Sequence, residues 1–175
     1  MLEDTRYKLR EADFFLRHLE SAYGSILKNT EGVGFYLNAF LGAGRSVGAH
    51  LEKEGGDGYQ LWWARRWKSL TKDQSSLLGF TNDQRTDSAQ ISGPEIERWG
   101  GWVPAIEIQQ ELVREGGSFT VIASAAQGAS TPMVWRTTTR FIRFPETPIV
   151  DVCRNYLALL NGIVNEYEAH PRSLP

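Results

Sequence analysis

Two arginines in this chain have the chemistry of an anion site. Arg45 lies in the middle of a predicted helix crowded with small residues, and Arg85 lies at the end of a later predicted helix. A guanidinium keeps its charge at all ordinary pH values, and its planar fork of donors suits phosphate and carboxylate oxygens. A buried arginine must otherwise be paired, and Asp73, Asp83 and Asp87 are acids available for a structural ion pair. Anion binding and structural pairing are therefore both open at Arg45 and Arg85.

The segment WWARRWKSLTK, residues 62–72, mixes tryptophans with cations. Aromatic platforms along a basic track bind single-stranded nucleic acid. The alternative is an ordinary helix with its tryptophans in the core and its charges in water. Arg136, Arg140 and Arg143 raise a similar choice between a surface for an acidic partner and solvated strand charges.

Composition narrows the class of protein. The 175 residues carry a formal net charge of −2, which argues mildly against avid non-specific nucleic-acid binding. Cys153 is the only cysteine, so an internal disulfide and a cysteine metal cluster are excluded. No apolar run approaches the ~18–20 residues of a membrane span, and the charged start does not resemble a signal peptide. We expect a cytoplasmic protein without a metal or cofactor and without membrane association.

Helices should position the two arginines. Residues 4–90 show helical periodicity, with an apolar stripe on the first helix that includes Phe14. TEGVG (30–34) is predicted as a turn, and the glycines of GGDG (55–58) should end the second helix. Two shorter helices follow, and Thr71 is the expected cap of the latter.

The second helix holds Gly42, Gly44 and Gly48 within seven residues. Each glycine costs about 1 kcal/mol in a helix interior relative to alanine. The sequence therefore predicts close approach of another backbone, from a neighbouring helix or a second copy of the chain. A kinked helix is the alternative.

The later part of the chain changes character. Residues 91–104 contain Gly and Pro and are predicted as a loop, and about 103–145 as a small antiparallel β-meander. Residues 147–170 are predicted as a helix capped by Thr147. One apolar stripe runs along it, so Cys153 should be a core residue. The fold class is α+β, mainly α, with four to five helices in a single domain of residues 1–175.

The order of FYLNAFLGAGRSVGAHLEKE, LWWARRWKSLTKDQSSLLGFTNDQR and the late helix resembles the HEPN (higher eukaryotes and prokaryotes nucleotide-binding) superfamily. It is most similar to uncharacterised bacterial members, in which an alanine-arginine-serine element and a tryptophan-tyrosine pair precede an aspartate. Here these elements are AGRSV, WW and Asp73. The resemblance covers the first 90 and last 25 residues, and not the β-insertion.

This resemblance implies an RNA-cutting site, usually repeated across a homodimer. Active members place a histidine four to six residues after an arginine, as the base that removes the proton of a ribose 2′-hydroxyl. Arg85 matches the arginine, but Gln90 stands at the histidine's position. Glutamine cannot take up a proton near neutral pH. Rescue by another histidine, with His50 the best placed of the three in the chain, would be required for cleavage.

We therefore predict a non-catalytic binding or regulatory protein, with Arg45, Arg85, Asp73 and Asp87 as candidates to bind an anion, nucleotide or RNA. The candidate catalytic pair is Arg85 and Gln90. One alternative is a metal-independent, toxin-like endoribonuclease with an atypical base. Another is a protein-interaction module that uses the β-insertion to contact a protein partner. A homodimer is expected in each case.

Overall fold

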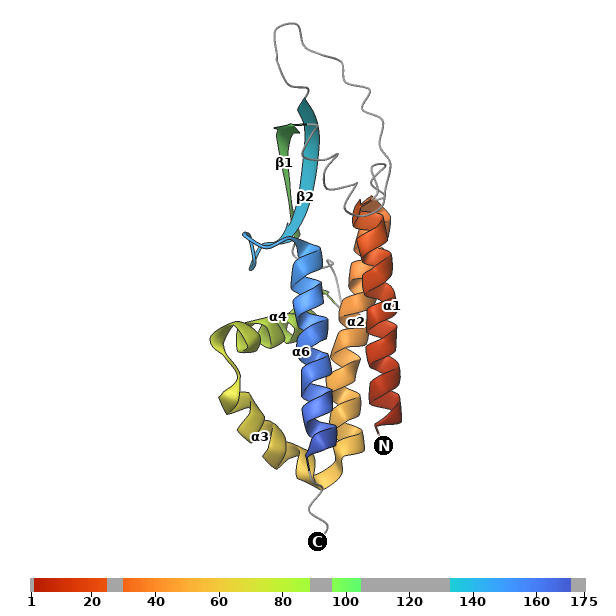
Figure 1. The fold of residues 1–175 in the computed structure, drawn as a ribbon, viewed down its shortest axis with the longest axis vertical. Helices are drawn as coiled ribbons and strands as arrows, with labels where there is room; N and C mark the ends of the chain where they lie inside the picture. The colour runs from red at the N-terminus through yellow and green to blue at the C-terminus, as the bar shows by residue number, and fades with distance from the viewer. Residues whose placement is uncertain (1, 25–29, 89–95, 105–132, 171–175) are drawn as a thin grey trace, which may run out of the picture.

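The chain is mostly helical in a computed structural model that describes residues 2–24, 30–88, 96–104 and 133–170. Three long helices lie side by side (Figure 1): α1 (Glu3–Gly24), α2 (Thr30–Gly55) and α6 (Ile149–Ala169). The segment beside them consists of the 3-10 helix η1 (Gly56–Gly58), α3 (Tyr59–Ser69) and α4 (Lys72–Ser88), and it bends between α3 and α4. The predicted helical class is confirmed. None of the helices in these ranges is both long and apolar enough to cross a membrane.

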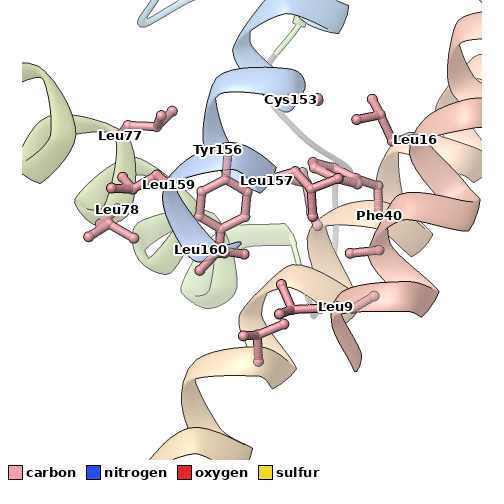
Figure 2. Packing of buried hydrophobic residues seen from close by; sticks show 14 of the residues in the cluster. Leu9, Leu16, Phe40, Leu77, Leu78, Cys153, Tyr156, Leu157, Leu159 and Leu160 are labelled. Carbon is pink, nitrogen blue, oxygen red and sulfur yellow. The ribbon is translucent and has the colours of Figure 1, made fainter. Parts of the chain in front are cut away.

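The core lies between α1, α2 and α6, and α4 closes one side (Figure 2). Leu9 and Leu16 of α1 and Phe40 of α2 face the α6 side chains. The predicted inclusion of Phe14 in the buried stripe is wrong, because its side chain is 55% exposed. The buried face of α1 is set instead by leucines and an alanine at helical spacing, namely Leu2, Leu9, Ala12, Leu16 and Leu19.

The second helix begins earlier than predicted. Thr30–Gly34 forms its first turns and not a separate turn. Val33 and Leu37 are buried there, so packing outweighs the cost of the glycines. The predicted end is confirmed: α2 stops at Gly55, and Gly56 has φ of 64°, a left-handed conformation that glycine adopts without steric cost.

Capping was predicted correctly for one helix and wrongly for another. The backbone N–H of Gln74 donates to Thr71 Oγ1 at 3.2 Å, and the backbone N–H of Thr71 donates to the side-chain Oε1 of Gln74 at 3.1 Å. These two bonds form a capping box at the start of α4. Thr147 does not cap α6. The N-cap residue is Pro148, which makes no side-chain cap, and its fixed φ of −55° suits the entry into the helix.

The described residues before α6 include two paired strands. β1 (Ile96–Pro104) pairs antiparallel with β2 (Met133–Phe141), in a register from Ile96↔Phe141 to Pro104↔Met133. The prediction of a loop over 91–104 is therefore wrong for β1, because its ladder with β2 satisfies the backbone despite two glycines. The rest of the predicted meander, 105–132, lies outside the described residues. Phe141 anchors β2 to the helices, with its ring 4.8 Å from that of Phe80 in α4.

The first turn of α1 is held by carboxylates from the ends of α2 and α6. Glu54, at the end of α2, accepts hydrogen bonds from the amides of Asp4 (3.0 Å) and Thr5 (2.8 Å) and from the Thr5 hydroxyl (2.5 Å). Arg6 donates to Glu168 at the end of α6 at 2.5 Å. Glu54 therefore acts as an N-cap supplied by another helix, satisfying donors that have no partner within α1.

Candidate anion site

A cavity of about 70 Å³ lies between α2, α3, α4 and α6. From α2, Gly44, Arg45 and Gly48 line it, and from α6, Tyr156 and Leu160. Figure 2 shows the Tyr156 ring close to Leu160, between Leu78 of α4 and Phe40 of α2. The cavity is therefore lined by residues from segments about 100 residues apart in the sequence.

Gly44 allows one wall of the cavity to form. A Cβ at this position would lie 2.6 Å from Cε1 of Tyr156, closer than real atoms pack. The missing side chain thus lets the Tyr156 ring lie against the α2 backbone. The predicted close approach is therefore made at Gly44 by a ring and not by a backbone, whereas Cβ atoms at Gly42 and Gly48 would meet nothing within 4 Å.

Arg45 is the cation among the described residues that line the cavity. Its Nη1 atom is buried and has no hydrogen-bond partner among the residues that the structure describes. No ion pair joins Arg45 to an acid among the side chains that the structure describes, and Asp73, one candidate for structural pairing, is exposed at the start of α4. A buried donor on a charged group without a partner costs free energy, and native proteins rarely leave one unsatisfied.

The tyrosines of the cavity are held in their neutral forms. Burial raises the pKa of Tyr156, although a hydrogen bond with Thr81 and the charge of Arg45 oppose the rise. Burial, with the nearby charge of Glu52, raises the pKa of Tyr59 to about 12. Both groups are therefore phenols at neutral pH, able to donate a hydrogen bond but unable to compete for Arg45 as anions.

Of the other predicted site residues, only Asp73 has a described side chain, and it is exposed. Arg85 and Asp87 lie in the last turns of α4, where the described residues include no side chains. Gln90 lies outside the described residues altogether. Asp73 is at the opposite end of α4 from Arg85. The proposed pairing of Arg85 with Gln90 stays a prediction.

The histidines have structural surroundings of their own. His18 stacks on Tyr36, with ring centroids 5.2 Å apart. His50 Nδ1 lies 4.0 Å from Asp4 Oδ2, beside the first turn of α1. His170 follows the last turn of α6 and is exposed. These contacts place His18 of α1 against α2 and His50 of α2 against α1.

The aromatic residues of α3 divide between the core and the surface. Trp62 is buried against Tyr167, with ring centroids 4.7 Å apart, and Trp63 lines the cavity. Trp67 is 41% exposed. Arg66 donates to Glu166 of α6 at 3.0 Å, so one cation of the predicted basic track is neutralised within the protein.

Arg140 and Arg143, two of the three arginines in and after β2, have interactions within the protein. Arg140 Nη1 donates to the carbonyl oxygen of Pro145 at 2.5 Å, bracing the turn that leads into α6. Arg143 is exposed after β2 and has interactions within the protein. Arg136 lies in β2, at a position whose side chain is outside the described residues.

Sequence reasoning selected Arg45 and the glycines of its helix but missed Tyr156 and Trp63 as its surroundings. The spacing in AGRSVG was a usable signal, because glycines beside an arginine in a helix make room for a partner. Comparisons of the chain with protein-family models, with curated proteins and with solved structures give no match.

Proposed function

We propose that this chain is a non-catalytic, HEPN-like binding or regulatory protein whose ligand is an anion held by Arg45. The observation that carries the proposal is the buried Nη1 atom of Arg45, which has no hydrogen-bond partner in the described part of the chain and belongs to a residue lining a cavity. Such a donor gains free energy when an anion supplies the missing acceptor, because charge-assisted hydrogen bonds are stronger than neutral ones.

The non-catalytic part of the proposal rests on chemistry. Gln90 occupies the position where the resemblance calls for a base, and loss of a general base typically lowers a rate by about 10²–10⁴-fold. The tyrosines beside Arg45 have raised pKa values, so they do not supply a base at neutral pH either. A homodimer and a cytoplasmic location belong to the same proposal.

The experiment that tests the proposal is thermal melting with a panel of anions that includes phosphate, nucleotides, short RNAs and small carboxylates. A ligand that binds only the folded state raises the melting temperature, Tm. Arg45→Met should abolish that rise, whereas Arg65→Met, an exposed arginine on α3, should leave it intact. The proposal is wrong if no anion raises Tm or if the rise survives in Arg45→Met.

RNA integrity in the same samples decides the catalytic question. We expect the RNA to stay intact in the presence of the wild-type protein. Cleavage that is lost in Arg85→Ala would overturn the non-catalytic assignment and would establish another group as the base.

A further inference from the structure

The walls of the cavity restrict which anion can enter. Apart from Arg45, the cavity is lined mainly by aliphatic and aromatic groups, including Val47, Leu160 and Ile163. Arg45 is the sole cation among the described residues that line it. An anion in this place therefore meets one guanidinium and a mainly apolar surface.

This donor set suits a carboxylate better than a phosphate. A carboxylate presents one charge and two oxygens, which match the guanidinium fork in a bidentate pair. A phosphate monoester presents about 1.5–2 charges and three acceptor oxygens, which require several donors. Residues Gly44–Leu51 lie inside α2, where the backbone N–H groups donate hydrogen bonds within the helix. The backbone therefore offers no free N–H groups for a phosphate there.

The size of the cavity limits the body of the ligand. Its volume of about 70 Å³ is roughly half of the ~150 Å³ in an apolar cavity that accommodates benzene. It is far below the ~300–1,000 Å³ typical of pockets that enclose larger ligands, so a nucleotide does not fit inside. An aliphatic chain of about two to four carbons fits against Val47, Leu160 and Ile163.

From these three observations we propose that the ligand of the Arg45 cavity is a short-chain aliphatic monocarboxylate. Its carboxylate pairs with Arg45, and its alkyl group packs on the apolar wall formed by α2 and α6. This inference rests on the proposed anion-binding function and names the class of anion.

The test is ligand-observed saturation-transfer NMR with the intact chain and sodium acetate, propionate, butyrate and hexanoate, each at the same ionic strength. Propionamide is the neutral control of matched shape, and methylphosphonate is the control of higher charge. We expect saturation transfer to propionate and butyrate, a weaker signal for hexanoate, and none for propionamide. At ten times the dissociation constant, propionate should raise Tm by about 3–6 °C.

Two variants locate the binding. Arg45→Met removes the charge, and Gly48→Val fills part of the cavity while retaining Arg45. Gly48→Val should fold, because a Cβ at this position meets nothing within 4 Å. Both variants should lose the propionate signal, and Gly42→Ala, outside the cavity lining, should keep it.

The outcomes separate this inference from the proposed function. Binding of phosphate or nucleotides that depends on Arg45, without carboxylate binding, overturns the carboxylate inference and leaves the anion-binding function standing. Propionate binding that survives in Arg45→Met places the ligand elsewhere and overturns the inference. An absence of binding by every anion overturns both.

Discussion

The contact between Gly44 and Tyr156 gives the sharpest prediction about how the cavity is built. In Gly44→Ala, the new methyl group would start 2.6 Å from Cε1 of Tyr156. The ring is only 3% exposed and packs edge-on against Phe40, with centroids 6.1 Å apart, so it has little room to move. Gly42→Ala makes the same chemical change two residues earlier in α2, where a Cβ meets nothing within 4 Å.

The two variants should change the free energy of unfolding in opposite directions. Replacing a helix-interior glycine by alanine stabilises by about 0.8–1 kcal/mol, which is the expected gain at Gly42. At Gly44 the same gain is offset by overpacking of about 1–3 kcal/mol, for a net loss of up to about 2 kcal/mol. The difference between the variants therefore isolates the Tyr156 contact, and it corresponds to about 2–4 °C in Tm for each kcal/mol in a chain of this length.

Urea and thermal unfolding of both variants measure this difference. The double variant Gly44→Ala with Tyr156→Leu provides the control, because removal of the ring should relieve the overpacking and give a coupling energy of at least about 1 kcal/mol. Equal stabilisation by Gly44→Ala and Gly42→Ala, or additive effects in the double variant, would refute the assignment of Gly44 to this contact.

Three further predictions concern charges and assembly. Arg45→Met should raise the Tm of the ligand-free protein relative to Arg65→Met, because it removes a buried donor that has no partner among the described residues. A lower Tm would indicate a structural ion pair. For Glu54, burial raises the carboxyl pKa, but hydrogen bonds from Thr5 and Asp4 and the nearby His50 outweigh it, so the folded-state pKa lies below the ordinary 4.5. The stabilisation from ionised Glu54 should therefore be complete above about pH 4.5 and be lost as the pH falls through the lowered folded-state pKa. Urea unfolding should show that Glu54→Gln costs about 1 kcal/mol at pH 7 and less near pH 3. A Glu54→Gln penalty that does not diminish at acid pH would contradict this. Sedimentation velocity should give the mass of a homodimer, and a monomer at all accessible concentrations would remove that part of the proposal.

Local patterns predicted those elements whose signals lie within one turn or one helix. The apolar stripe predicted for the last helix is confirmed, because all its residues are buried in α6, namely Ile149, Val152, Cys153, Tyr156, Leu160, Ile163 and Tyr167. Cys153 lies on this stripe, and burial raises the pKa of its thiol, as expected for a core residue. The glycines after α2 and the capping box at Thr71 were equally local.

The failures arose where distant segments decide the outcome. Thr30–Gly34 reads as a turn on composition, but burial of Val33 against the core draws it into α2. Residues 96–104 read as a loop because of Gly and Pro, and pairing with β2 makes them a strand. The site shows the same division: Arg45 stands out in the sequence, whereas Tyr156, which lines the same cavity, is identified only by the docking of α6 on α2.

The order of helices along the chain has a consequence for synthesis. α1 and α2 emerge from the ribosome first and can form a hairpin, but α6, which covers their apolar faces, follows about 90 residues later. At about 5–20 residues per second, Leu9, Leu16 and Phe40 remain uncovered for roughly 5–20 s on every nascent chain. We therefore expect truncation before α6 to yield aggregates and not a smaller folded bundle, because the apolar faces of α1 and α2 would stay exposed.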